Sequence, residues 1–345
     1  MKRILIASTG EGAGKTSIIA GTITAVQKRF GYIKPLGDRL VYKRKKNVDH
    51  DALVLLKLLR LAEEPDSISL GFSHSKLGFK YDDKSIRTAL TAMAESSESG
   101  CDTLFIEGGK DLAYGTSVHL DSLSLGRYLN ARLVLVVGGD VDRVMDDIRF
   151  VKTNVDLSNI DFGGFIINKI HDIDDFKNSY LKSITDLGVK VFGIIPYKVQ
   201  LTHFSMSSLA DRFVAKVIAG EEGLSNIVKH IFVGAMSTEE SLRNPMFNKD
   251  NKLIITSGDR SDMIVAALES DTFGVILTNN ILPPPNILSK ASEKHIPILL
   301  VPYDTYEVAR QMDNFPSLLM PDDEDRVRFL AQIVKEYVQL DALIG

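Results

Sequence analysis

A glycine-rich segment near the start of the chain limits what it can fold into more than any other feature. Residues 9–16 read Thr-Gly-Glu-Gly-Ala-Gly-Lys-Thr and follow the apolar run Lys2–Ala7. The glycines allow positive φ angles and a close approach of backbone N–H groups to phosphate oxygens. Because the segment follows a predicted strand and opens a predicted helix, it predicts a loop that holds a nucleoside triphosphate. A turn that merely joins the strand to the helix is the alternative.

The residues of this phosphate loop have separate expected roles. Lys15 is expected to be solvent-accessible and to reach the β- and γ-phosphates, and the hydroxyl of Thr16 to bind Mg²⁺. The helix that follows adds the positive end of its dipole. Thr9 stands where the usual pattern has its first glycine. The residues predicted to bind the nucleotide here are Thr9, Gly10, Glu11, Gly12, Ala13, Gly14, Lys15, Thr16 and Ser17.

Short apolar runs alternate with helical patterns through the first part of the chain. The runs are Lys2–Ala7, Tyr32–Lys34, Thr103–Ile106, Leu133–Val137, Gly164–Ile167 and Val191–Ile195. Runs of this kind suit the central strands of a parallel sheet that helices cover on both faces. They predict a doubly wound α/β fold, which binds its ligands at the carboxyl ends of the strands.

A second βαβ series follows. Its strands are expected at His230–Val233, Leu253–Thr256, Gly274–Leu277 and Pro297–Val301. At 345 residues the chain is also long enough for two domains. The segment Ala219–Leu224, with two glycines and two glutamates, is a candidate linker. We therefore expect a parallel-sheet phosphate-loop domain at 1–215 and a smaller α/β domain at 216–345.

The composition limits the partners of the chain. The formal net charge of −4 argues against nucleic acid or an anionic membrane as the main partner. No segment reaches the roughly 18 uninterrupted apolar residues of a membrane helix. The single cysteine, Cys101, rules out an internal disulfide and a cysteine-based zinc cluster. We expect a cytoplasmic protein.

Asn168 and Lys169, directly after a predicted strand, are similar to the base-reading element of many phosphate-loop proteins. An aspartate two residues beyond the lysine would select guanine, but His171 occupies that position. Asn168 is therefore expected to meet the amino group of an adenine, which favours ATP over GTP. The alternative is an asparagine that ends the strand in a turn.

Three further segments fit one known group of proteins. They are Tyr32-Ile33-Lys34-Pro35-Leu36-Gly37, Phe105-Ile106-Glu107-Gly108-Gly109 and Val191-Phe192-Gly193-Ile194-Ile195-Pro196. Together with Thr9, which is a trait of the group, they resemble the dethiobiotin synthetase-like phosphate-loop proteins over roughly residues 1–215. The resemblance implies that Lys34 approaches phosphate and substrate, that Glu107 binds Mg²⁺ through hard oxygen ligands, and that Pro196 lies near the adenine.

The loop and the resemblance together define a predicted site. Its catalytic residues are Lys15, Lys34 and Glu107, and its metal ligands are Thr16, Asp49 and Glu107. Asp49 and Asp51 have a second interpretation, because aspartate favours the N-cap of a helix such as the one expected from Ala52. Lys34 could also be a solvated lysine at a strand end, and Glu107 a surface or capping carboxylate.

The second part of the chain resembles the DRTGG domain. The similar segments are Val233-Gly234-Ala235-Met236-Ser237, Gly258-Asp259-Arg260-Ser261-Asp262 and Pro302-Tyr303-Asp304-Thr305. Asp259 and Arg260 are expected either to bind a small anionic ligand or to pair with each other. The two domains in this order resemble the region that precedes the catalytic domain of long phosphotransacetylases. Because the chain ends at Gly345, we expect it to lack that catalytic domain.

Two functions remain open, and we favour the first. It is a regulatory protein in which ATP controls the second domain or a dimer, and the resemblance implies a homodimer. The other is an ATP-dependent ligase acting on a carboxylate or amine, in which Lys15, Lys34 and Mg²⁺ stabilise the transferred phosphoryl group. Glutamine-dependent ligases that resemble residues 1–215 add a cysteine-nucleophile domain, whereas Cys101 precedes a predicted core strand. A partition-type ATPase would need an extra lysine early in the loop.

Overall fold

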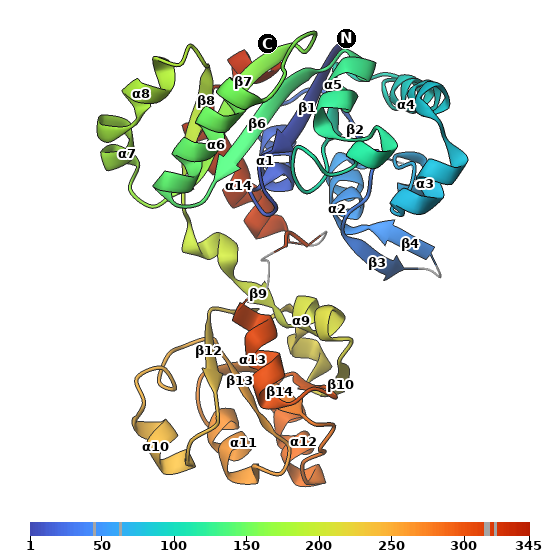
Figure 1. The fold of residues 1–345 in the computed structure, drawn as a ribbon. Coiled ribbons are helices and arrows are strands. Elements are labelled where there is room, and N and C mark those ends of the chain that lie inside the picture. The colour runs from blue at the N-terminus through green and yellow to red at the C-terminus, as the bar shows by residue number, and fades with distance from the viewer. Residues whose placement is uncertain (44–45, 62–63, 314–317, 321–322) are drawn as a thin grey trace. The chain divides into compact units, whose positions relative to one another are not determined.

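The computed structural model of the chain describes residues 1–43, 46–61, 64–313, 318–320 and 323–345. Within these residues the chain forms two compact units (Figure 1). The first unit consists of Met1–Lys198 and Leu319–Gly345, and the second of Val199–Leu318. Each unit is built on a largely parallel sheet with helices against it. This arrangement confirms the predicted doubly wound α/β fold class.

The sheet of the first unit places the end of β1 near its middle. Its strands, in order across the sheet, are β2 (Phe30–Ile33), β5 (Thr103–Glu107), β1 (Lys2–Ser8), β6 (Arg132–Gly138), β7 (Phe162–Ile170) and β8 (Val191–Pro196). Neighbouring strands pair in parallel. The chain leaves β1 towards β2 on one side and later continues to β6 on the other. Ligands of doubly wound sheets bind where connections diverge in this way.

The predicted apolar runs lie within these strands, with one difference. Residues Ile4–Ala7 of β1 are at most 2% exposed, because helices cover both faces of the sheet. The run Tyr32–Lys34 was expected to be a strand, but β2 ends at Ile33. Lys34 therefore lies beyond the end of the strand, at the edge of the sheet where the phosphate loop also lies.

Helices, short 3₁₀ segments and one hairpin surround this sheet. The helices of the first unit are α1 (Lys15–Ala25), α2 (His50–Leu59), α3 (His74–Lys80), α4 (Asp83–Ser97), α5 (Ser122–Leu129), α6 (Val141–Asn154), α7 (Ile173–Ser179), α8 (Leu181–Thr185), α14 (Glu324–Tyr337) and α15 (Leu340–Ile344). The other elements are β3 (Leu40–Lys43) and β4 (Lys46–Asp49), which form the hairpin, η1 (Pro65–Ser67) and η2 (Thr116–Val118). The buried residues of α6 are Val144, Ile148 and Val151, which share one face of a 3.6-residue helix.

The middle of α1 is buried on more than one side, unlike the amphipathic helices at the surface. Consecutive residues from Ile18 to Thr22 are buried, so one side of α1 faces the sheet and another faces α14. Gly21 permits this packing, since a Cβ there would lie 2.6 Å from Val334 Cγ2 and 3.0 Å from the carbonyl oxygen of Leu330. α14, red in Figure 1, thus packs directly against the helix that begins with the phosphate loop.

The units do not coincide with the expected ranges 1–215 and 216–345. α9 (Met206–Phe213) buries Met206, Leu209 and Phe213 in the core of the second unit, so the second unit begins before residue 215. At the other end, 319–345 return to the first unit. The candidate linker Ala219–Leu224 lies within the second unit, where Ala219 belongs to its core. Burial of apolar helix faces decides these borders, and glycine content does not mark them.

The second unit repeats the architecture on a smaller scale. Its strands, in order across the sheet, are β10 (Lys216–Ala219), β15 (Ile298–Leu300), β14 (Thr272–Thr278), β13 (Lys252–Ser257) and β12 (His230–Val233). β10 runs antiparallel to β15, and the other neighbours pair in parallel. The remaining elements are η3 (Val199–Thr202), β9 (Phe204–Ser205), η4 (Glu221–Ser225), β11 (Ile227–Val228), α10 (Thr238–Arg243), α11 (Ser261–Leu268), α12 (Pro285–Glu293) and α13 (Thr305–Asp313).

The sheet of the second unit has an apolar core on each face. Ile254 belongs to one core cluster, whereas Leu253 and Ile255 belong to the other, as the two-residue period of a strand requires. Both faces of the sheet are therefore covered. Among the helices that the structure describes, none combines the length and the hydropathy of a membrane-spanning segment.

The contact between α1 and α14 can be tested with a pair of glycine variants. Gly21→Ala should lower the free energy of unfolding by about 1–2 kcal/mol, because the new Cβ overlaps Val334 and Leu330. Gly78→Ala in α3 is the matched control, since its Cβ would meet Val118 at an ordinary 3.7 Å. That control should gain about 0.5–1 kcal/mol from reduced freedom of the unfolded chain. Urea denaturation measures both, and an equal gain in the two variants would show that α14 does not press on α1.

Candidate functional site

The phosphate loop joins β1 to α1 through glycines whose backbone other residues could not easily adopt. Gly12 and Gly14 have φ angles of 75° and 105°. A Cβ on Gly14 would lie 2.4 Å from the amide nitrogen of Asn168, so a side chain at this position would clash as well as strain the backbone. The loop geometry therefore needs glycine at the residue before Lys15.

Lys15 is buried, and the expectation that it would be solvent-accessible was wrong. It is 8% exposed, and its ammonium donates a hydrogen bond to Ser8 Oγ at 3.0 Å. Burial lowers the pKa of Lys15, although the nearby carboxylate of Glu107 opposes that shift. The physical reason is that Lys15 begins α1 and packs against Ser8 at the end of β1, with Glu107 of β5 nearby.

Thr16 and Glu107 form the centre of the site. The hydroxyl of Thr16 donates to Glu107 Oε1 at 2.8 Å, and the hydroxyl of Tyr32 donates to Oε2 at 2.8 Å. Glu107 ends β5 and is 1% exposed. Burial raises the pKa of Glu107 to about 7, and the attraction of Lys34 opposes the rise. Glu107 is thus a buried carboxyl group at the end of β5, so the alternative of a surface carboxylate does not apply, and its contact with Mg²⁺ stays a prediction.

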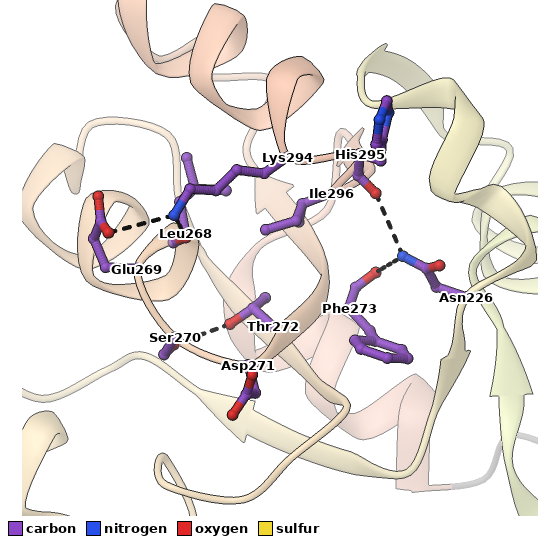
Figure 2. A pocket seen from close by; sticks show the side chains of 10 residues that line it. All are labelled: Asn226, Leu268, Glu269, Ser270, Asp271, Thr272, Phe273, Lys294, His295 and Ile296. Carbon is purple, nitrogen blue, oxygen red and sulfur yellow. Dashed lines mark hydrogen bonds and ion pairs between the residues drawn. The ribbon is translucent and has the colours of Figure 1, made fainter.

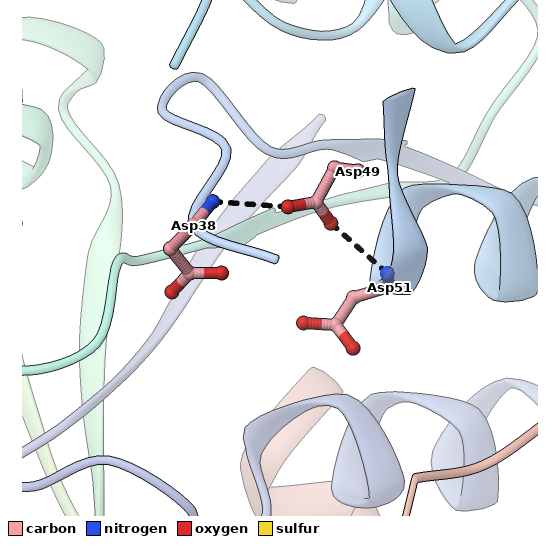
Figure 3. A group of neighbouring side chains, drawn as sticks. All are labelled: Asp38, Asp49 and Asp51. Atoms are coloured by element: carbon pink, nitrogen blue, oxygen red, sulfur yellow. Dashed lines mark hydrogen bonds between the residues drawn. The ribbon is translucent and has the colours of Figure 1, made fainter. Parts of the chain in front are cut away.

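Lys34 lies among three carboxylates. Its ammonium is 2.6 Å from Asp38 Oδ1, 3.2 Å from Asp49 Oδ1 and 2.6 Å from Asp51 Oδ2. Figure 3 shows the three aspartates turned towards a common space, and their oxygens lie within 4.8 Å of one another. Such a cluster could hold a metal ion, but the ammonium of Lys34 supplies the positive charge there. Lys34 is 0% exposed, so it is not a solvated lysine.

The charges of this cluster support one another. Burial alone would lower the pKa of Lys34, but Asp51, followed by Glu107 and the other aspartates, raises it well above its ordinary value. Burial alone would also raise the pKa of Asp51, but Lys34 holds it below its usual range. Arg39 adds a second cation, with its Nη1 3.6 Å from Asp51 Oδ1. Lys34 and Asp51 therefore stabilise each other in their charged forms.

Asp49 has a structural role that the sequence offered as an alternative. Its Oδ1 accepts hydrogen bonds from the backbone N–H groups of Asp51 and Ala52, which makes it the N-cap of α2. Its Oδ2 accepts from the backbone N–H groups of Asp38 and Arg39. Both carboxylate oxygens are thus already engaged, and the predicted contact of Asp49 with Mg²⁺ stays a prediction. The oxygens of Asp51 contact the side chains of Lys34, Arg39 and His50. Asp51 is therefore the more available of the two aspartates for a metal ion.

Asn168 and Lys169 hold the phosphate loop from the end of β7. The amide nitrogen of Asn168 donates to the carbonyl oxygen of Ala13 at 2.7 Å, and its oxygen accepts from the backbone N–H of Lys169. The ammonium of Lys169 donates to the carbonyl oxygen of Gly12 at 2.8 Å. The predicted contact of Asn168 with adenine stays a prediction. Pro196, at the end of β8, pairs with Ile170 of β7 and so lies beside this strand end.

The remaining loop residues make contacts outside the loop. Thr9 Oγ1 donates to Asp147 Oδ2 at 2.6 Å, and Asp147 also pairs with Arg143 of α6 at 3.0 Å. Glu11 lies 3.7 Å from the ammonium of Lys110, which follows β5. The structure therefore brings the predicted loop residues to the same edge as Lys34 and Glu107, while their contacts with a nucleotide remain predictions.

Four contributors to this site were not predicted from the sequence. They are Ser8, Tyr32, Asp38 and Arg39. A signal existed for Tyr32, because residues two apart near a strand end point the same way, and Tyr32 is two residues before Lys34. Ser8, Asp38 and Arg39 carry no local pattern that separates them from ordinary strand-end and turn residues.

The second unit has a smaller group of polar contacts, between Arg260, Asp262 and Thr238. Arg260 pairs with Asp262, at 3.3 Å, and donates to the carbonyl oxygen of Met236 at 3.0 Å. The carboxylate partner of Arg260 is therefore Asp262. Within the described residues, Arg260 forms no ion pair with Asp259, which was one of the two expectations. Asp262 also accepts a hydrogen bond from Thr238. Binding of a small anion at this edge remains a prediction.

A cavity of about 560 Å³ lies at the opposite edge of the second sheet. Figure 2 shows that the start of β14 lines one side of this cavity, with Asp271 just before the strand and Phe273 in it. The loop before β15, with Lys294 and His295, lines the other side. Lys294 donates to the carbonyl oxygen of Leu268, so its ammonium is already engaged. The cavity lies at the amino ends of strands, whereas α/β sheets bind ligands at the carboxyl ends. We therefore do not assign it as a functional site.

Comparison with solved structures gives two distant similarities. The chain is similar to the MinC:MinD cell division protein complex of Aquifex aeolicus, with 16% identity, a TM-score of 0.38, and coverage of 58% of this chain and 84% of that one. It is also similar to the CBS and DRTGG domains of the regulatory region of Clostridium perfringens pyrophosphatase, complexed with the activator diadenosine tetraphosphate. There the identity is 21%, the TM-score 0.29, and the coverage 35% of this chain and 49% of that one.

Curated relatives match along nearly the whole chain. The phosphate acetyltransferase of Synechocystis sp. is 22% identical over 362 residues, which cover 99% of this chain and 51% of the relative. That of Nitrosomonas europaea is 22% identical over 371 residues, which cover 100% and 51%. The chain thus spans about half the length of the curated relatives it matches.

Family profiles match both parts of the chain. The profile of the AAA domain matches residues 2–205, which is more than half of the chain, and the profile of the DRTGG domain matches residues 208–315. The chain therefore belongs to the AAA domain family, as a dethiobiotin synthetase-like phosphate-loop domain followed by a DRTGG domain, the architecture of the N-terminal half of long phosphotransacetylases.

Proposed function

We propose that the chain binds ATP with Mg²⁺ at the phosphate loop, and that nucleotide occupancy regulates the second unit or a partner protein instead of driving a synthetic reaction. A cytoplasmic homodimer is part of this proposal, on the basis of the composition and the family resemblance. The observation that carries the regulatory part is the way in which the second unit is inserted into the first.

The fit of a triphosphate rests on the loop. A Cβ at Gly12 would meet no atom within 4 Å, so the loop is open there, and the N-terminus of α1 has no side-chain cap and directs the positive end of its dipole towards the loop. Lys15 and Lys169 bring two ammonium groups to the loop. That of Lys15 donates to the hydroxyl of Ser8, and that of Lys169 donates to the carbonyl oxygen of Gly12. Both cations would stabilise the negative charge of bound phosphates.

The fit of Mg²⁺ rests on Thr16 and Glu107. Their hydroxyl and carboxylate oxygens lie 2.8 Å apart, and both are hard ligands of the kind that Mg²⁺ prefers. Burial raises the pKa of Glu107, so a cation beside it would stabilise the ionised carboxylate. When bound, Mg²⁺ would neutralise charge on the β- and γ-phosphates. Asp51 is close enough to Glu107 to contribute to its raised pKa, and offers a further carboxylate.

The regulatory part follows from the connections between the units. The chain enters the second unit at Val199, directly after β8 and Pro196, where the resemblance places the adenine. It returns to the first unit as α14, which packs on α1 through Gly21. One connection thus leaves from β8, and the other leads into a helix that packs on α1, the helix that follows the phosphate loop. A change in the position of α1 or of the end of β8 would reach the second unit through the chain itself.

The ligase alternative has less support. In a ligase the charge of Lys34 would act on the transferred phosphoryl group, whereas here three aspartates within 3.2 Å already compensate it. The experiment is to incubate the protein with ATP and Mg²⁺, alone and with acetyl phosphate, biotin precursors or simple amines. Regulation predicts slow hydrolysis that none of these compounds changes greatly. Turnover strongly stimulated by a carboxylate or an amine would contradict the regulatory proposal.

Lys15→Ala should abolish ATP binding in calorimetry and leave the circular dichroism spectrum unchanged. The ammonium donates a hydrogen bond to the hydroxyl of Ser8, which can donate to other acceptors, so its removal costs little structure but deprives the phosphates of a cation. Lys28→Ala, at an exposed position beyond the end of α1, is the matched control and should bind ATP as the wild type does. Unchanged ATP affinity in Lys15→Ala would refute the proposed phosphate site.

Glu107→Gln should reduce Mg²⁺-dependent turnover more than nucleotide binding. The amide keeps the shape and can still accept from Thr16, but it removes the negative charge that holds the cation. Nucleotide affinity is measured by calorimetry with and without Mg²⁺, and turnover by phosphate release. Equal losses in affinity and turnover would indicate a structural role for Glu107.

The pH dependence of stability provides an independent check on Glu107. Folding raises the pKa of this carboxyl from about 4.5 to about 7, so the folded chain holds a proton that the unfolded chain has lost between these pH values. The free energy of unfolding of the wild type, without nucleotide or Mg²⁺, should therefore fall as the pH rises through this window. Relative to Glu107→Gln the fall should be of the order of 3 kcal/mol at most. Parallel urea-denaturation curves for both proteins at all pH values would show that the raised pKa is absent.

A further inference from the structure

An aromatic pair stands at the carboxyl ends of β7 and β8. His171 follows β7 and Tyr197 follows β8, and their rings lie 4.5 Å apart between centroids with an interplanar angle of 30°. The backbone N–H of Tyr197 donates to the carbonyl oxygen of Ile170 at 2.8 Å, which fixes the two segments to each other. The pair is therefore held by the sheet and not by a long flexible loop.

The position of the pair relative to the phosphate loop is set by Asn168. Asn168 contacts Ala13 of the loop, and His171 lies three residues further along the same chain segment. Three residues span at most about 10 Å, a distance comparable to that between the phosphates and the base of a nucleotide. A triphosphate held by the loop would thus have its base within reach of the rings.

The rings are also accessible. His171 is exposed and Tyr197 is half-buried, whereas a core pair such as Phe30 and Phe105 is no more than 3% exposed. Stacked rings with an open side offer a flat surface to another planar ring, and base–aromatic stacking contributes on the order of 1–3 kcal/mol. Packing between two loops is the simpler explanation of the pair, and it makes different predictions.

We propose that His171 and Tyr197 form the platform on which the purine base of the bound nucleotide stacks, and that this pair decides the preference for ATP over a bare triphosphate or a pyrimidine nucleotide. The proposal rests on the proposed binding of ATP at the phosphate loop and adds the residues that recognise its base. The two rings pack on each other, so a base would stack on the open face of the pair, where the larger ring system of a purine favours ATP over CTP.

The test compares three probes on the full chain. ATP, CTP and inorganic tripolyphosphate, each with Mg²⁺, are titrated by calorimetry into the wild type and into Tyr197→Ala, Tyr197→Phe and His171→Ala. The wild type should bind ATP more tightly than CTP or tripolyphosphate. Tyr197→Ala should weaken ATP binding roughly 10-fold and leave tripolyphosphate unchanged, since only the base has lost its partner. Tyr197→Phe should retain the affinity for ATP because it retains the ring.

Two further variants make the result specific. His171→Ala removes an exposed ring with little risk to the fold and should also weaken ATP selectively. Tyr306→Ala, which removes a tyrosine that is 76% exposed on α13 of the second unit, is the matched control and should bind all three probes normally.

The outcomes separate this proposal from the one on which it rests. Unchanged ATP affinity in both Tyr197→Ala and His171→Ala would overturn the stacking platform and leave ATP binding at the loop intact. An equal loss of ATP and tripolyphosphate would also overturn it, because the ring would then support the fold of the loop. A wild type that binds neither ATP nor tripolyphosphate would refute the proposed function and the platform together.

Discussion

The buried ammonium of Lys34 is the constraint on which the arrangement of the site depends. A charge in this position is costly unless it is paired, and Asp38, Asp49 and Asp51 offset that cost from three directions. Asp49 also caps α2 and accepts from the backbone at the start of the hairpin. Through its contacts with Lys34, with the backbone before the hairpin and with the first turn of α2, Asp49 therefore joins the end of β2, the base of the hairpin and the start of α2.

The charges around Lys34 also influence the pKa values of Glu107 and Lys15. Glu107 experiences the attraction of Lys34 and Lys15 and the repulsion of Asp51, and burial leaves its pKa near 7. Lys15 is in turn stabilised by Glu107 against the effect of its own burial. The proposed ligands would enter this balance with charges of both signs, phosphates beside the lysines and Mg²⁺ beside Glu107. A site with this much buried charge is expected to respond to nucleotide binding, because few of its groups can change partners independently.

Much of the fold could be predicted because burial on both faces demands continuous apolar runs, and the runs in β1, β5, β6, β7 and β8 are of that kind. The phosphate loop could be predicted because its glycines and the pair Lys15-Thr16 lie between an apolar run and a helical pattern. The burial of Lys15 could not, since it depends on Ser8 of β1 and on Glu107 of β5, which come together with Lys15 only in the folded chain. For the same reason the end of the second unit was misplaced, because an amphipathic helix does not specify in its sequence which sheet it covers.

The sequence by itself determined the phosphate loop, the approximate positions of most strands in each unit, and the parallel-sheet α/β class. These are local properties, set by glycine conformations and by the period of apolar residues. Tertiary structure alone decided that Lys34 is enclosed by Asp38, Asp49 and Asp51, that Asp49 is a helix cap, and that His171 meets Tyr197. Those contacts join segments that are separate in the chain, and their energies come from burial and charge pairing that exist only after the sheet has formed.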